Sequence, residues 1–413
     1  MKKIKLIELL NHEDGLFKLT SIINWDFLEL SAGVNYVEGP GRPKIKTRLI
    51  VGLHYLKYLE NKSDEEAVKT FLHNPYWQYF CGNEYFEHNF PIHPSTLSRW
   101  RNKLGLEKVE KLLEETINAA KREMLIKEKD FKKLNIDTTV QEKNITFPTD
   151  AKLLHKMRRK LVMAAQKRNL TLRQSYERLG QAAFIMQCRY AHSRKMKKAK
   201  KELKKLKNYL GRVIRDIERN IPNPDKKLES LLNIAKKLFM QKKDDKNKIY
   251  SIHEQEVECI AKGKSHKKYE FGCKVSITST VTSNWIVGAN AFHSNPYDGH
   301  TLIPSIAQVE RLVGQRPTVI NADQGFKGEK NHPEGISVLI TGKKNKSSAI
   351  KKFMKKRSAI EPIIGHLKSD HRLTRNYLKG KLGDIVYSIL SAFAFYLKKI
   401  LNSIAISKKV IYA

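Results

Sequence analysis

Apolar positions in the first 125 residues recur at intervals of three and four, the spacing of one face of an α-helix. The pattern is clear in TRLIVGLHYLKYLEN and EEAVKTFLHNPYWQYF, and Ser63 with Glu66 forms a capping-box pattern before the second segment. HPSTLSRWRNKLG adds a short predicted helix, capped by Ser95 and ended by Gly105. The sequence therefore predicts a helical N-terminal domain over residues 1–125.

From about residue 131 the pattern changes to the alternation and β-branched residues typical of strands. A first strand is expected in FKKLNIDTTVQEKNITF, and a hairpin in KYEFGCKVSITST and NWIVGANAF. DGHTLIPSIAQVERLVG predicts a helix closed by Gly314, and PTVINADQG and GISVLITG predict two further strands before a helical C-terminal part. This order predicts an α/β sheet covered by helices, in a domain built from residues 126–150 and 246–400.

Residues 151–245 are predicted to be a long helical insertion after the first strand. Between Arg194 and Arg219 this segment has twelve basic residues and three acidic ones. Such a run is most often a solvated helix face. Positive charge at helical spacing also suits a clamp on the DNA backbone, so both interpretations stay open.

The overall charge favours a polyanionic partner. The chain has 79 Lys and Arg against 42 Asp and Glu, a formal net charge of +37. Nucleic acid is the first candidate and an anionic membrane surface the second, although an AT-rich genome also enriches lysine. No stretch approaches ~18 uninterrupted apolar residues, since Lys398 and Lys399 interrupt the longest one. No membrane association is therefore expected.

Cysteine usage and the start of the chain indicate the compartment. The four cysteines form no C-x-x-C pair, which disfavours a zinc finger and a disulfide framework. The opening MKKIKLIELLNHEDG has too short an apolar run for a secretory signal. We expect a cytoplasmic protein.

Two aspartates stand where strands disfavour them. Asp137 lies in mid-strand in LNIDTTV, and Asp323 ends the apolar run of VINADQG, where it could also simply shape a turn. An acid on a following helix, Glu361, would complete a set of oxygen ligands of the kind that Mg²⁺ takes in proteins. These three carboxylates are the predicted metal ligands.

Glu361 follows a strongly basic run, with eight basic residues and no acidic one between Lys343 and Arg357. At about 100° per residue, Arg357, Glu361 and Lys368 fall within about 40° of one another on a helix. One face would then present a metal-binding acid flanked by cations that contact DNA phosphates. The alternative is a surface helix with an ordinary Arg–Glu pair. Pro362 requires the helix to begin or bend near Glu361.

Six blocks of the chain, in order, carry a resemblance: NIDTTV, FPTDAKLL, ECIAKGKSHKKYEFGCKVS, NPYDGHTL, ADQGFKG and RSAIEPIIGHLKSDHRL with RNYLKG. Together they resemble bacterial insertion-sequence transposases of the DDE type, in insertion-sequence group five. The resemblance covers most of the chain and implies a ribonuclease-H-like catalytic domain with a mixed sheet. The family's catalytic acids fall on Asp137, Asp323 and Glu361.

The family signature around the glutamate, Tyr-x2-Arg-x3-Glu-x6-Lys, matches at Arg357, Glu361 and Lys368, while Met354 stands in place of the tyrosine. The resemblance implies cleavage at transposon ends with two Mg²⁺ (or Mn²⁺) per active site, and joining of the freed 3′-hydroxyl to target DNA. It implies DNA as the partner and a homodimer, because two ends must be joined. A bacterial cytoplasmic location follows, at the nucleoid when DNA is bound.

Further candidates lie outside the acids. Arg99 and Arg101, in the first turns of the Ser95 helix, are predicted phosphate contacts, unless they are merely solvated around an inward-facing Trp100. His300 and Trp285 are weaker candidates for phosphate or metal contact and base stacking, with helix-start hydrogen bonding and core packing as the favoured alternatives. Asp298 and Asp150 are assigned to helix capping. The two alternative functions are a catalytically inactive DNA-binding protein and a ribonuclease-H-like nuclease.

Overall fold

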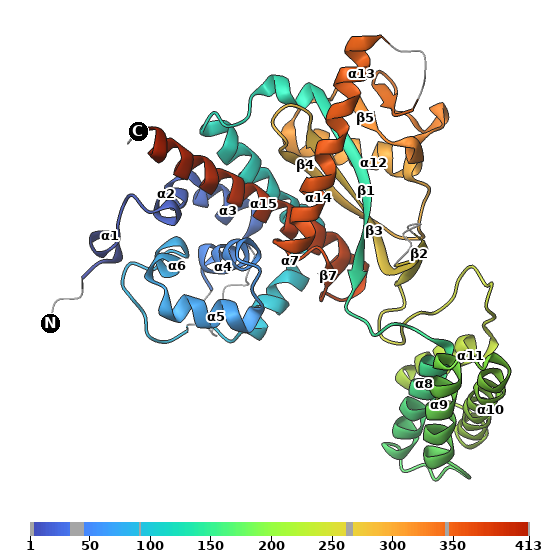
Figure 1. The fold of residues 1–413 in the computed structure, drawn as a ribbon. Helices are drawn as coiled ribbons and strands as arrows, with labels where there is room; N and C mark the ends of the chain where they lie inside the picture. Colours follow the sequence, from blue (N-terminus) through green and yellow to red (C-terminus); the bar gives the residue numbers. More distant parts are fainter. Residues whose placement is uncertain (1–3, 34–44, 91, 262–266, 343–346, 412–413) are drawn as a thin grey trace. The chain divides into compact units, whose positions relative to one another are not determined.

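The computed structural model describes residues 4–33, 45–90, 92–261, 267–342 and 347–411 of the chain. It divides into two compact units, each visible in Figure 1. Unit 1 comprises residues 1–144 and 262–413, and unit 2 comprises residues 145–261. The fold is mixed α/β, as the sequence predicts.

Unit 1 begins with helices. They are α1 (Leu6–Leu9), α2 (Gly15–Ile22), α3 (Trp25–Ala32), α4 (Thr47–Leu59), α5 (Asp64–His73), α6 (Pro75–Phe80) and α7 (Ser95–Arg122). The capping box before α5 is confirmed, because the Ser63 side chain accepts from Glu66 N and the Glu66 side chain accepts from Ser63 N. Within α7 the backbone at Gly105 is non-helical, with φ 72°, so the predicted helix end there is a break between two helical segments.

The sheet and its helices follow. They are η1 (Glu128–Lys132), β1 (Lys133–Lys143), β3 (Tyr269–Thr280), β4 (Ile286–Phe292), η2 (Asp298–Thr301), α12 (Leu302–Val313), β5 (Val319–Ala322), η3 (Gln324–Phe326), η4 (Glu329–Asn331), β6 (Ser337–Ile340), α13 (Ser348–Lys355), η5 (Lys356–Ala359), α14 (Ile360–Ser369), β7 (Arg375–Asn376) and α15 (Gly380–Ile411). The predicted hairpin is confirmed, since β3 and β4 pair antiparallel. β1 runs antiparallel to β3 and parallel to β5, and β5 runs parallel to β6. Gly314 ends α12 in the left-handed conformation.

One hydrophobic core joins the N-terminal helices to the sheet. It includes Leu53 of α4, Leu113 of α7, Ala289 of β4 and Phe393 of α15, each fully buried. A smaller cluster lies among β1, β5 and α12. The predicted helical domain and the predicted catalytic domain therefore share a core within unit 1, and their separate functions stay predictions.

Unit 2 is a group of packed helices followed by a short strand. Its elements are α8 (Asp150–Gln166), α9 (Glu177–His192), α10 (Met196–Asn220), α11 (Lys226–Met240) and β2 (Glu258–Ala261). Leucines at helical spacing on α10, among them Leu206 and Leu210, pack into its core, and basic residues occupy most of its exposed positions. Thr149, rather than the predicted Asp150, caps α8 with its side chain.

The apolar helix α15 meets the length and composition of a membrane span over Gly380–Ile406. Half of that stretch is buried inside the protein. A buried core helix passes the same test, so this single helix is weak evidence for a membrane.

Candidate active site and nucleic-acid interface

Two of the three predicted acids are brought together by strand register. The parallel pairing of β1 with β5 sets Asn135 opposite Asn321. Continued by two residues along each strand, this register would set Asp137 opposite Asp323, which lies just past the end of β5. Registered residues of neighbouring strands point to the same face of a sheet. Both aspartates are half-buried there.

Arg357 connects the first and the third acid. Its Nη1 donates to Asp137 Oδ2 at 3.1 Å, and its Nη2 donates to Glu361 Oε1 at 3.0 Å. Arg357 belongs to η5 and Glu361 to the first turn of α14, which lies against β1 (Figure 1). Pro362 is accommodated in that first turn, as predicted. The two carboxylates share one guanidinium although their positions are far apart in the sequence.

Two buried asparagines position this arrangement. Asn321 Nδ2 donates to Asn135 Oδ1 at 3.1 Å, and Asn135 Nδ2 donates to the carbonyl of Lys356 at 3.1 Å. Both side chains are fully buried. Each precedes its aspartate by two residues, so amide and acid share one face of their strand. These amides tie β5, β1 and the segment before α14 together.

A fourth carboxylate, Asp298, also lies at the site. It does not cap a helix as predicted, because its Oδ1 accepts from Thr138 Oγ1 at 2.9 Å and from Lys274 Nζ at 2.8 Å. A Cβ added at Gly325 would lie 2.6 Å from Asp298 Oδ2 and 3.0 Å from Asp323 Oδ1. Asp298 and Asp323 therefore line one small space that the absence of a side chain at Gly325 keeps open.

Asp137 and Glu361 are gathered around Arg357, and the three predicted acids do not surround one point. Among the described residues, Asp137, Asp323 and Glu361 do not form a group with all ligand atoms within 4.8 Å of one another. Exposure also differs, since the side chain of Asp137 is 17% exposed and that of Glu361 is 64% exposed. A cation binding all three would have to compete with the guanidinium of Arg357.

The prediction for Arg101 is wrong. Its side chain is only 4% exposed, and its Nη1 and Nη2 donate to Asp64 Oδ1 and Oδ2 at 2.9 and 2.6 Å. Burial opposes ionisation of Asp64, but the bonds from Arg101 and Lys57 hold the pKa of its carboxyl well below the usual range. A buried guanidinium engaged at both ends is not available to DNA. Arg99, in contrast, is exposed and its phosphate contact stays a prediction.

The remaining candidates take ordinary positions. Trp285 is 2% exposed and packs against Tyr396, which confirms core packing. His300 is exposed and its ring meets that of Tyr297 edge-on. Lys368 is half-buried near the end of α14, two turns from Glu361, and Met354, in the place of the signature tyrosine, is buried.

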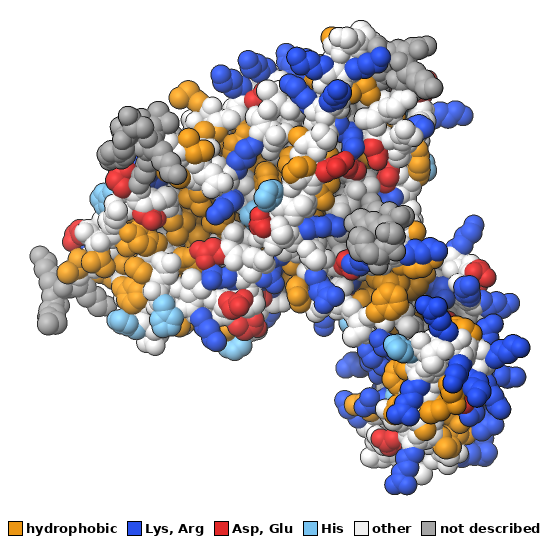
Figure 2. Space-filling view, in the orientation of Figure 1, with side chains coloured by type: hydrophobic (Ala, Val, Ile, Leu, Met, Phe, Trp, Pro, Cys, Tyr) orange, Lys and Arg blue, Asp and Glu red, His pale blue; other side chains and the backbone are white. Residues whose placement is uncertain are grey.

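Unit 2 presents a dense basic surface. Of the twelve basic residues between Arg194 and Arg219, all are exposed except the half-buried Lys207. Figure 2 shows many Lys and Arg side chains on the visible face of this unit, interspersed with hydrophobic and other side chains. A cavity of about 240 Å³ is lined by Tyr176, Gln174, Asp216 and four arginines, namely Arg173, Arg212, Arg215 and Arg219. Positive charge at this density is expected to attract phosphate.

Comparison with known proteins gives a family match for the N-terminal part of the chain. Residues 5–103, within the N-terminal helices of unit 1, match the family described as "Transposase domain (DUF772)". This match supports a transposase family for the chain. It is also 41% identical over 190 residues to "Uncharacterized protein ORF8 in nfe locus" of Rhizobium meliloti, an alignment that covers 46% of this chain and 91% of that protein. No solved structure gives a significant match.

A transposase domain implies a DNA-cleaving enzyme and DNA as its partner. The matched region contains Asp64, Arg99 and Arg101, whereas the acids around Arg357 lie outside it. The family match therefore supports DNA cleavage in general, and any assignment of catalytic residues rests on the arrangement of the acids in unit 1.

Proposed function

We propose that this protein is a transposase of the DDE type, and that it cleaves phosphodiester bonds at transposon ends and joins the 3′-hydroxyl ends to target DNA. Asp137, Asp323 and Glu361 are the proposed catalytic acids on a ribonuclease-H-like domain. The mixed sheet supports that fold, because β1 is antiparallel to β3 and parallel to β5. The observation that carries the proposal is the pairing of Arg357 with both Asp137 and Glu361.

The side chains at the site suit two Mg²⁺ or Mn²⁺ ions. All the candidate ligands are carboxylate oxygens, which hard divalent cations prefer. The space beside Gly325, which a Cβ would fill, lies next to oxygens of Asp323 and Asp298. Ions bound among these acids would activate the attacking oxygen and stabilise the leaving oxygen of the phosphodiester. Asp137, Asp323 and Glu361 would hold them, and Asp298 is added as a neighbouring acid.

Protein side chains would position the DNA. Arg357 neutralises two acids in the structure and carries a planar guanidinium that can hold a phosphate bidentately. Lys368, on the same helix as Glu361, supplies a second cation for the backbone. Arg99 and the basic surface of α10 are proposed to contact phosphates of flanking DNA without reading sequence. Because two ends have to be joined, the active form is proposed to be a homodimer.

The test is cleavage of labelled DNA carrying the ends of the encoding element, with Mg²⁺, by the wild type and by Asp323→Asn. The substitution removes a ligand charge at nearly constant volume, so cleavage should fall to background. Asp150→Asn is a matched control, because Asp150 is an exposed residue of unit 2. Equal cleavage by the wild type and Asp323→Asn would rule out the assignment of that residue.

Strand transfer separates the two enzymatic alternatives. A ribonuclease-H-like nuclease would cut the labelled strand but would not join the cut 3′-end to a second DNA. A DNA-binding protein without catalysis would bind the ends and produce neither product. Cleavage together with a joined product is the expected outcome.

A further inference from the structure

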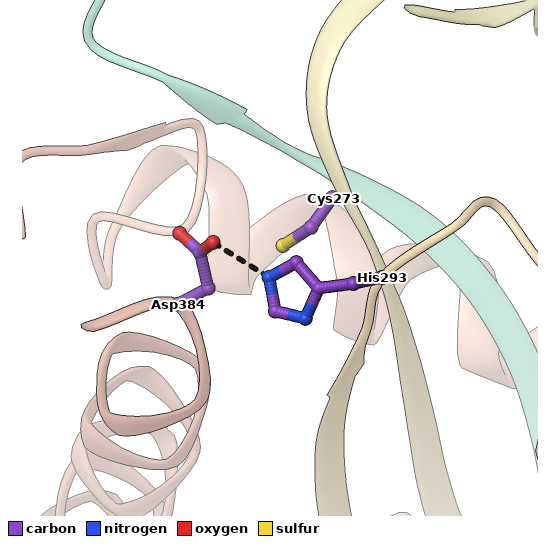
Figure 3. A group of neighbouring side chains, drawn as sticks. All are labelled: Cys273, His293 and Asp384. Carbon is purple, nitrogen blue, oxygen red and sulfur yellow. Dashed lines mark hydrogen bonds and ion pairs between the residues drawn. The ribbon is translucent and has the colours of Figure 1, made fainter. Parts of the chain in front are cut away.

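A second cluster of potential ligands lies in unit 1, apart from the catalytic acids. Cys273 of β3, His293 just after β4 and Asp384 near the start of α15 each offer a ligand atom, and these atoms all lie within 4.8 Å of one another. His293 Nε2 and Asp384 Oδ2 are 2.9 Å apart. Figure 3 shows the sulfur, the imidazole and the carboxylate turned toward one another from three different elements.

The cluster is buried and its surroundings fix its members. Cys273 and Asp384 are 1% and 2% exposed. Asp384 Oδ1 accepts from Lys143 Nζ at 2.7 Å and from Asn376 Nδ2 at 2.6 Å, so the other carboxylate oxygen faces His293. Gln141 Oε1 accepts from Asn376 Nδ2 at 3.2 Å and from Cys273 Sγ at 3.7 Å. Outer hydrogen bonds of this kind orient the ligands in metal sites.

We propose that Cys273, His293 and Asp384 bind one transition-metal ion of the Zn²⁺ class. A thiolate, an imidazole and a carboxylate are the ligand types that Zn²⁺ takes, whereas Mg²⁺ and Ca²⁺ prefer oxygen alone. On binding, the Cys273 thiol loses its proton to solvent, and the proton of His293 resides on Nδ1 so that Nε2 donates its lone pair to the ion. Three protein ligands leave one coordination position for water.

Lys143 bears on the charge of this site. Its ammonium is buried against Asp384 and would lie close to the ion. Without metal, Lys143 and Asp384 form a neutral pair. With metal bound, the divalent ion, the Cys273 thiolate, the Asp384 carboxylate and the Lys143 ammonium together carry a net charge of one positive. The site is therefore expected to hold its metal less tightly than one with two thiolates, and to weaken at acid pH as the thiolate is protonated.

The site does not depend on the proposed function. Cys273 pairs with Gln141 of β1, and Asp137 lies four residues away along that strand, about 13 Å at the usual rise per residue. Cys273 and Lys274 are neighbours in β3, so their side chains leave the strand on opposite faces. Lys274 reaches Asp298 and Cys273 reaches the start of α15, whereas Asp137 is on the same face as Cys273 and is separated from it by the distance along β1. A metal here would tie β3, β4 and α15 together and stabilise unit 1.

The test uses the purified full-length chain, stripped of metal and titrated with Co²⁺ as a spectroscopic substitute for Zn²⁺. We expect one equivalent to bind, with a thiolate-to-cobalt charge-transfer band in the near ultraviolet that Zn²⁺ abolishes by displacement. Cys273→Ser should lose the band. The matched control, Cys188→Ser, changes an exposed cysteine of unit 2 and should keep it.

Cys273→Ser alters a fully buried position, so its far-ultraviolet circular dichroism spectrum has to match that of the wild type. His293→Gln is the second variant, because it tests the site at a less buried position. In His293→Gln the sulfur remains, so the band should persist while Co²⁺ affinity falls by about tenfold or more. Absence of the band in the wild type, its survival in folded Cys273→Ser, or unchanged affinity in His293→Gln would each overturn the proposal. None of these results bears on Mg²⁺-dependent cleavage.

Discussion

Acidification from pH 7 to pH 5 is expected to destabilise unit 1, and the buried His54 has a contribution that can be isolated. His54 is fully buried in α4, with its Nδ1 2.7 Å from the carbonyl of Ile50 and its Nε2 3.1 Å from Arg101 Nη1. The first contact requires a proton on Nδ1 and the second requires a lone pair on Nε2, so the folded protein holds the neutral ring. Burial, and then the charge of Arg101, lower the pKa of His54 to about 3.

The magnitude follows from the difference in proton binding between the two states. The unfolded chain protonates His54 near its ordinary pKa of 6.5, and the folded protein only near about 3. A depressed pKa contributes stability that is complete above 6.5 and is lost as the pH falls toward the folded value. Linkage then gives a loss of about 2 kcal/mol in the free energy of unfolding between pH 7 and pH 5.

Urea denaturation followed by tryptophan fluorescence measures this loss, because all four tryptophans, Trp25, Trp77, Trp100 and Trp285, belong to unit 1. The comparison is between the wild type and His54→Gln, which cannot ionise. The variant is less stable at pH 7 but should lose about 2 kcal/mol less on acidification. His88→Gln, at an exposed position, should behave as the wild type. Equal pH dependence in wild type and His54→Gln would refute the reasoning.

Three further predictions concern charge. Asp64→Asn leaves Arg101 buried without its anion and should lower the free energy of unfolding by about 3 kcal/mol in the same assay; a loss below about 1 kcal/mol would contradict the buried pair. Arg357→Gln removes the cation shared by two acids, so Mn²⁺ binding, followed by electron paramagnetic resonance, should tighten by about tenfold, and weaker binding would argue against a metal among these acids. Replacing four exposed lysines between residues 194 and 219 by glutamine should reduce the slope of log DNA affinity against log salt by about three to four, and an unchanged slope would exclude the clamp.

Local signals in the sequence predicted most elements of the fold. The Ser63–Glu66 capping box and the glycine at 314 act through neighbours a few residues away, so their effect can be inferred from spacing alone. The same holds for the alternation in β1, β3 and β4. Element order was then enough to predict an α/β sheet covered by helices, whereas the mixed strand directions were implied by the family resemblance. Whether that sheet is ribonuclease-H-like stays a proposal.

Long-range partners explain what the sequence did not predict. Arg101 occupies a helix position typical of a DNA contact, but its partner Asp64 lies in another helix, and no spacing rule connects the two. Asp298 stands at the start of a helix, where capping is the usual role, yet it accepts from Thr138 on β1. The sequence did contain a hint in each case. Asp64 and Asp298 are acids that could accept hydrogen bonds from side chains of another element instead of capping a helix or facing solvent. Only the packing of the elements decides between the alternatives.

The placement of the acids depends on amide side chains as much as on apolar packing. Burying an amide without partners costs roughly 1–3 kcal/mol, so Asn135 and Asn321 favour the register and helix position in which their hydrogen bonds form. A slip of β5 against β1 by one residue would separate the two amides and move Asp323 to the other face. A shift of the segment before α14 would break the bond to Lys356 and carry Arg357 and Glu361 with it. The pair of asparagines thus penalises the displacements that would scatter the acids, a role that two apolar side chains at the same core positions could not fill.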